Sequence, residues 1–217
     1  AFAPTIAPLI GAQIIKHYSW HVTFDLLAIV ACFSFIISLF VTETLNKADR
    51  LKGNVFQSIF SLKEIVVNKP FMTFMLSMAG TSIIYMSFLA ISSYIYIEWF
   101  NLSETEYSLF FAVNSLLLLV GPNVYLAVRK KLLPNQIIQI SFSLIVISGI
   151  LILTIGKISP YLFLIAFAPV TFSNGFLRAF SSNILLGQKN MNSGGAASII
   201  NFSGTALGAL GMMIGTL

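Results

Sequence analysis

Ionisable side chains within long apolar runs are the groups in this sequence that could do chemistry. Arg178 lies in the apolar run from Pro160 to Leu186. If the run is helical, Arg178 is about nine residues, or roughly 13 Å, from its carboxyl end. A charged group is costly inside a bilayer, so this arginine is a functional candidate by default. Two interpretations stay open: Arg178 contacts an anion, a substrate or a carboxylate, or its long side chain reaches the lipid headgroups.

A histidine and an aspartate near the start of another apolar run form a second candidate. His21 and Asp25 are four residues apart, so a helix would place them on one face. Histidine titrates near pH 6.5, so the pair could carry a proton; an interfacial pair without function is the alternative. His17 lies a further four residues back, but the turn at Tyr18–Trp20 separates it from the pair. No metal site is therefore expected.

Uncharged polar side chains in the apolar runs could complete a binding pocket. A pocket for a drug-sized molecule combines apolar walls with a few polar groups. The alternative for each residue is a hydrogen bond that joins two membrane helices. Together with Arg178, the candidates for a substrate cavity are Asn114, Tyr85, Tyr94, Asn174 and Asn183.

The composition places these residues in a membrane. Of 217 residues, 57% are hydrophobic and 9% are charged, whereas about a quarter of the residues in soluble domains are charged. We therefore interpret the formal charge of +5 as a sign of membrane topology and not of nucleic-acid binding. The single cysteine, Cys32, excludes an internal disulfide framework. The loops contain no HExxH sequence, nucleophile elbow or phosphate-binding loop, so we expect neither an enzyme nor a cofactor.

Seven apolar runs predict membrane helices, and no strand alternation competes with them. We expect the first run to be the end of a longer segment, because it is short and the chain begins inside it. The fold class is therefore an all-α membrane protein of about seven transmembrane helices. The runs are Ala1 to Ile15, His21 to Val41, Phe71 to Ile97, Tyr107 to Val128, Ile137 to Ile155, Pro160 to Leu186 and Gly194 to the end.

The loops between these runs alternate in charge. One set carries nine of the twelve basic residues, whereas the opposite set carries Lys16, Lys157 and three glutamates. The positive-inside rule places the first set, including residues 42–70, in the cytoplasm. Trp20, Trp99 and Tyr96 then lie at the outer boundaries and are interpreted as interfacial anchors. The basic residues of the cytoplasmic set are Lys47, Arg50, Lys52, Lys63, Lys69, Arg129, Lys130, Lys131 and Lys189.

The long cytoplasmic segment ends in an amphipathic pattern. Within VFQSIFSLKEIVV, apolar residues recur at Val55, Ile59, Leu62 and Val66. Spacing of three and four residues predicts a helix that lies along the membrane surface. An ordinary linker with a helical turn or two is the alternative.

Small residues line one face at each end of the chain. Ala3, Ala7 and Gly11 are spaced four residues apart, with Pro4 and Pro8 as a second stripe beside them. The last run contains Gly204, Gly208, Gly211 and Gly215. Small residues let helix backbones approach closely in a membrane. We therefore expect close helix packing at both places.

Short motifs follow one another along the whole chain. They are APTIAPLIGA at Ala3–Ala12, SWHVTF at Ser19–Phe24, VTETL at Val41–Leu45, NKPF at Asn68–Phe71, NLSETEYSLFFAVNSL at Asn101–Leu116, Gly121 with the basic residues Arg129, Lys130 and Lys131, and SGGAASII at Ser193–Ile200. In this order they resemble the motifs of drug/proton antiporters of the major facilitator superfamily. The resemblance is closest to the bicyclomycin/chloramphenicol-resistance branch.

The resemblance implies a partial major facilitator helical bundle that runs from about helix five to helix eleven. Residues 1–45 would be the last two helices of the N-terminal half, and residues 46–69 the cytoplasmic loop between halves. Residues 70–217 would be five helices of the C-terminal half. Gly121, Arg129, Lys130 and Lys131 would form a cytoplasmic basic motif. Helices one to four and helix twelve, with the acidic residue thought to carry the proton, would belong to the rest of the parent chain.

The implied function is a part in a proton-coupled exporter of small amphipathic drugs or metabolites in the inner membrane of a bacterium. Its partners would be the lipid bilayer, a small-molecule substrate, protons and the missing helices. His21 and Asp25 are the proton-coupling candidates within this sequence. An uptake symporter for a sugar, osmolyte or organic anion is one alternative, because fold does not decide function. A helical membrane scaffold without transport activity is the other.

Overall fold

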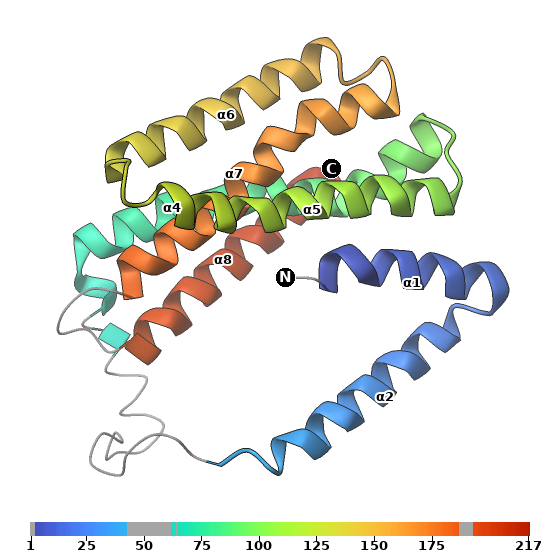
Figure 1. Ribbon diagram of the computed structural model, residues 1–217, viewed down its shortest axis with the longest axis horizontal. Helices are drawn as coiled ribbons and strands as arrows, with labels where there is room; N and C mark the ends of the chain where they lie inside the picture. Colours follow the sequence, from blue (N-terminus) through green and yellow to red (C-terminus); the bar gives the residue numbers. More distant parts are fainter. Residues whose placement is uncertain (1–2, 43–61, 64, 187–192) are drawn as a thin grey trace.

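The computed structural model describes residues 3–42, 62–63, 65–186 and 193–217, and these residues form helices without any strand (Figure 1). An all-α chain follows from continuous apolar runs, since helices satisfy their backbone hydrogen bonds internally. The elements are α1 (Ala3–His17), α2 (His21–Ser38), α4 (Lys69–Ser93), the π-helix η1 (Tyr94–Trp99), α5 (Glu104–Val128), α6 (Pro134–Thr154), α7 (Pro160–Leu186) and α8 (Ser193–Gly215).

Six of the described helical segments are long and apolar enough to cross a membrane. They are α2, α4 together with η1, α5, α6, α7 and α8. α1 has 15 residues and is shorter than a span requires. The expectation of a partial all-α membrane bundle is confirmed, and the helices follow the predicted apolar runs closely.

The helices from α4 to α8 form a bundle, and α1 and α2 lie at its side (Figure 1). Within the bundle, α4 packs on α8, and α7 packs on α5, α6 and α4. α1 runs beside α5, whereas α2 extends away from the bundle and buries none of its residues. The bundle is therefore the part of the described chain that can enclose a site.

Several helix starts carry sequence signals that fix them. Asn68 caps α4 by accepting a hydrogen bond from the Phe71 backbone N–H at 3.1 Å. Ser103 and Glu106 form a reciprocal capping box at the start of α5, which satisfies backbone N–H groups that have no partner within the helix. Pro134 and Pro160 occupy the first positions of α6 and α7, where a missing N–H costs nothing.

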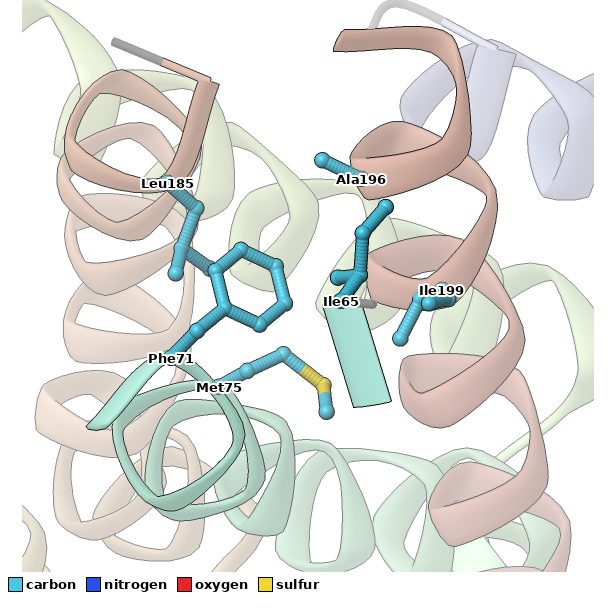
Figure 2. Packing of buried hydrophobic residues seen from close by; sticks show 6 residues of the cluster. All are labelled: Ile65, Phe71, Met75, Leu185, Ala196 and Ile199. Atoms are coloured by element: carbon cyan, nitrogen blue, oxygen red, sulfur yellow. The ribbon is translucent and has the colours of Figure 1, made fainter. Parts of the chain in front are cut away.

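Ile65 ties the segment before α4 to the bundle. Its side chain is 4% exposed and lies among residues of α4, α7 and α8 (Figure 2). Most of the predicted surface helix, residues 55–61 and 64, lies outside the described residues. Of its described positions, Leu62 packs against the cluster while Val66 is 51% exposed. The cluster consists of Ile65, Phe71, Met75, Leu185, Ala196 and Ile199.

Glycines allow α5 to approach α7 closely. A Cβ atom at Gly121 would lie 2.6 Å from the Phe176 backbone nitrogen, closer than real atoms come. A Cβ atom at Gly175 would collide with the Leu118 carbonyl oxygen. The two glycines therefore face the partner helix at one crossing. In a membrane, such contact replaces the hydrophobic drive that packs soluble helices.

Tyr96 corrects one expectation from the sequence. It lies in η1 and is 1% exposed, so it is not an interfacial anchor. Its ring stacks on Phe110 with ring centroids 5.1 Å apart and meets the edge of Phe163. A π-helix closes each backbone hydrogen bond over five residues instead of the four of an α-helix, and so changes which side chains face inward. Trp99, in the same π-helix, is 54% exposed.

Candidate functional site

A cavity of about 380 Å³ lies between α4, α7 and α8. Its walls combine apolar side chains with hydroxyl, amide and guanidinium groups, the mixture that small-molecule sites use. Each of the three helices contributes one face, at helical spacing. The described lining residues are Met75, Met78, Ala79, Thr81, Ser82, Tyr85 and Met86 of α4, Leu118 of α5, Asn174, Arg178, Ser181, Ser182 and Leu185 of α7, and Ile200, Asn201, Gly204, Thr205, Gly208, Ala209 and Met212 of α8.

α7 supplies the polar wall of this cavity. Asn174 and Arg178 are one turn apart and both line the cavity. The Asn174 side-chain amide donates a hydrogen bond to the Thr81 carbonyl oxygen at 3.2 Å, which joins α7 to α4. The Arg178 side chain is exposed to the cavity, and within the described residues no ion pair or hydrogen bond reaches its guanidinium. It is therefore free to meet a ligand.

α4 supplies the apolar wall. Met75, Met78 and Met86 line the cavity together with Met212 of α8. Methionine side chains are flexible and polarisable, so they adapt to ligands of different shapes. Tyr85 lies among them and is 7% exposed. This wall suits the apolar body of an amphipathic molecule.

The glycines of α8 close the cavity against α4. A Cβ atom at Gly208 would lie 2.9 Å from the Met86 Cγ atom, and one at Gly211 would collide with the Ile83 carbonyl oxygen. The Ser87 hydroxyl donates a hydrogen bond to the Gly211 carbonyl oxygen at 2.6 Å. Near Gly204 the helices are further apart, since the nearest atom to a Cβ there is the Ser82 hydroxyl oxygen at 4.0 Å. The cavity includes this wider part and extends along α8 past Gly208 to Met212.

Asn114 lies outside the cavity, within the bundle. It is 2% exposed on α5, and its side-chain oxygen accepts a hydrogen bond from the Thr171 hydroxyl of α7 at 2.5 Å. Its side-chain nitrogen has no hydrogen-bond partner among the described residues. Asn114 therefore joins two helices in this structure, the alternative that the sequence left open for each polar residue.

Tyr94 and Asn183 are also not among the described lining residues. Tyr94 is 65% exposed at the start of η1, and Asn183 is exposed on α7. Of the six predicted cavity residues, the structure brings together Arg178, Tyr85 and Asn174.

His21 and Asp25 lie on α2, away from the cavity, and both are exposed. The His21 Nδ1 atom is 2.7 Å from the Ser19 hydroxyl oxygen. Its ring stacks on Trp20 with centroids 3.6 Å apart. In the described part of the chain no ion pair links His21 to Asp25, and no cluster of three or more metal-ligating side chains is present.

The residues of the first small-residue face and of the basic motif are placed as follows. Ala3, Pro4, Ala7, Pro8 and Gly11 all lie in α1. Ala7 is exposed, and a Cβ atom at Gly11 would meet nothing within 4 Å among the described atoms. Gly121 lies inside α5 at the crossing with α7, and the basic residues Arg129, Lys130 and Lys131 follow the end of that helix and are exposed.

Sequence reasoning did not single out the methionines or most hydroxyl groups of the cavity. Their signal is helical spacing: Met78 and Ser82 on α4, and Asn201 and Thr205 on α8, are one turn apart. In a chain with so many apolar residues, methionine at such spacing is equally typical of a packed helix face. Only the arrangement of the three helices distinguishes the two.

Two comparisons with known proteins bear on this site. The sequence model described as Major Facilitator Superfamily matches residues 1–216. The chloramphenicol resistance protein CraA of Acinetobacter baumannii is 26% identical over 156 residues, which is 72% of this chain. The match spans 37% of that relative's own length.

Proposed function

Because the chain belongs to the Major Facilitator Superfamily, we propose that it forms part of a proton-coupled secondary transporter that exports small amphipathic drugs or metabolites. The cavity between α4, α7 and α8 carries this proposal, since a methionine-rich wall faces a polar wall across it. The similarity to a chloramphenicol resistance protein supports a small drug as the substrate class. Transporters of this kind bind a substrate, change conformation and release it, without an enzymatic step.

The two halves of such a transporter meet around the substrate and rock against one another. We assign residues 1–45 to the end of the first half, residues 46–69 to the connecting loop and residues 70–217 to the second half. The contact of α1 with α5 and the separation of α2 from the bundle agree with this division. His21 and Asp25 remain candidates for proton coupling, and further helices of the parent chain would complete the cavity.

The protein is an integral multi-pass membrane protein, and we place it in the inner membrane of a bacterium with residues 42–70 in the cytoplasm. Six described helices have the length and composition of membrane spans. The excess of lysine and arginine in alternate loops supports the orientation. The bacterial source of the chloramphenicol resistance protein supports the compartment.

Accumulation of chloramphenicol in cells that express the complete protein tests the export proposal. We expect less accumulation in energised cells than in control cells, and no difference once a protonophore has collapsed the proton gradient. Equal accumulation with and without the protein would overturn export. Higher accumulation in energised cells would instead indicate uptake.

A further inference from the structure

We propose that the cavity between α4, α7 and α8 selects amphipathic anions, with Arg178 binding the negatively charged group. This inference rests on the proposed function and names the charge of its substrate. The inference concerns the polar head of the substrate, because the methionine wall already suits the substrate's apolar body.

The charge of the cavity is the first argument. Arg178 is charged at any physiological pH, and none of the other described lining residues is charged. The acidic residues that the structure describes are Asp25 on α2, Glu98 in η1, and Glu104 and Glu106 at the start of α5. None of them lines the cavity. A single unpaired cation between low-dielectric walls attracts anions and repels cations more strongly than it would in water.

The position of Arg178 is the second argument. It follows Asn174 by one turn, and Ser181 and Ser182 line the same wall after it. The Ser181 hydroxyl donates to the Arg178 backbone carbonyl oxygen at 3.2 Å. The guanidinium has no hydrogen-bond or ion-pair partner among the described residues, so its donors are available to a ligand. A guanidinium fork binds a carboxylate, sulfonate or phosphate in a bidentate manner. Asn201 and Thr205 of α8 also line this space and can contribute hydrogen bonds to the head of such a ligand.

The volume of the cavity indicates the size of the part of the anion that α4, α7 and α8 enclose. About 380 Å³ lies near the lower end of the range of small-molecule sites. A molecule of one or two rings with one acidic group fits this space and can place its rings against Met78, Tyr85 and Met86. The acidic group of a membrane lipid has the same chemistry, so the experiment must separate the two sources.

Three probes with the same ring system and different charge test the proposal. These are 1-naphthoate, 1-naphthamide and 1-naphthylmethylammonium, titrated into the complete protein in phosphatidylcholine nanodiscs. We expect 1-naphthoate to bind about tenfold more tightly than the neutral amide, because hydrogen bonds to charged groups are the stronger ones. The cation should bind more weakly than the amide. Equal binding of all three probes, or preference for the cation, would overturn the proposal.

Variants then assign the preference to Arg178. Arg178→Gln should lose it, Arg178→Lys should keep part of it, and Lys157→Gln, which removes a charge outside this cavity, should keep all of it. If Arg178→Gln fails to fold, Arg178→Lys and the wild-type comparison still decide. A preference that survives in Arg178→Gln would overturn the proposal.

Lipid composition separates a free anion from a lipid headgroup. In nanodiscs that contain phosphatidylglycerol, the preference for 1-naphthoate should persist. If it disappears there, a lipid headgroup occupies Arg178 and the proposal of a substrate site is wrong. The accumulation assay is independent of all these binding measurements. If the protein does not export chloramphenicol but still prefers 1-naphthoate, the proposed function is wrong and the anion site stands.

Discussion

At the scale of single residues, Arg178 is the one basic side chain among the described cavity residues, and its loss should act on transport before it acts on folding. Arg178→Ala in the complete protein should lower transport of a bound anion about tenfold, since a charge-assisted hydrogen bond is lost. The amount of protein inserted in the membrane should not change. Wild-type transport by this variant would instead support an arginine that reaches toward the headgroups.

Asn114 and Thr171 make a second prediction at this scale. Because their hydrogen bond joins α5 to α7 inside the bundle, Thr171→Val should destabilise the protein by about 1 kcal/mol, a typical value for such bonds in membranes. Thermal unfolding in detergent measures the change. Asn123→Ala is the matched control, because that exposed amide bonds only to the Leu119 carbonyl oxygen of its own helix. Equal effects of the two substitutions would contradict the role of the pair.

The sequence identified Arg178, Tyr85 and Asn174 as cavity candidates, and helical geometry explains why the others lie elsewhere. Asn183 is nine residues beyond Asn174 and Tyr94 nine beyond Tyr85. At about 100° per residue, each lies on the opposite side of its helix. Asn114 belongs to α5, of which only Leu118 is among the described lining residues. Residue type gave the candidates, but helix phase and neighbours decide which of them meet.

At the scale of helices, close contacts at glycine separate packing positions from neutral ones. Gly121→Ala should destabilise the protein by about 1–3 kcal/mol, because the added methyl group overpacks the crossing of α5 and α7. Gly149→Ala in α6 is the control: nothing lies within 4 Å of a Cβ atom there. Gly149→Ala should stabilise the protein by about 0.5–1 kcal/mol, because alanine favours a helix interior more than glycine does. Unfolding temperatures of the two variants, measured in the same detergent, test this prediction. It would be wrong if Gly121→Ala unfolded at a higher temperature than Gly149→Ala.

The helices themselves could be predicted almost completely from apolar runs, because a membrane leaves few other backbone structures. The π-helix η1 could not, since YIYIEW continues the apolar run with no glycine or proline to mark a change. The two small-residue faces show the same limit. Gly208, Gly211 and Gly215 of α8 pack closely on α4, whereas a Cβ atom at Gly11 of α1 would meet nothing within 4 Å among the described atoms. The spacing of small residues predicts a helix face that can pack closely. Only the fold shows whether another helix lies against that face.

At the scale of the whole molecule, a transporter cavity must be reached by water while the outer helix faces meet lipid. Thr205 lines the cavity on α8, and Leu210 is 50% exposed but is not among the described lining residues. Leu210 is five positions after Thr205, so it points about 140° away around the helix. Cys32 is exposed on α2 and is the single native cysteine, so Cys32→Ala gives a background without thiols.

In that background, Thr205→Cys should react with a charged, water-soluble maleimide at least about tenfold faster than Leu210→Cys, because the reactive thiolate forms poorly in apolar surroundings. Bound 1-naphthoate should slow the reaction at Thr205→Cys and leave Leu210→Cys unchanged. The same measurement in denaturing detergent controls for intrinsic reactivity and should give equal rates. Equal rates in the folded protein would mean that the space between α4, α7 and α8 is closed to water, and a closed space cannot serve as the path of a substrate.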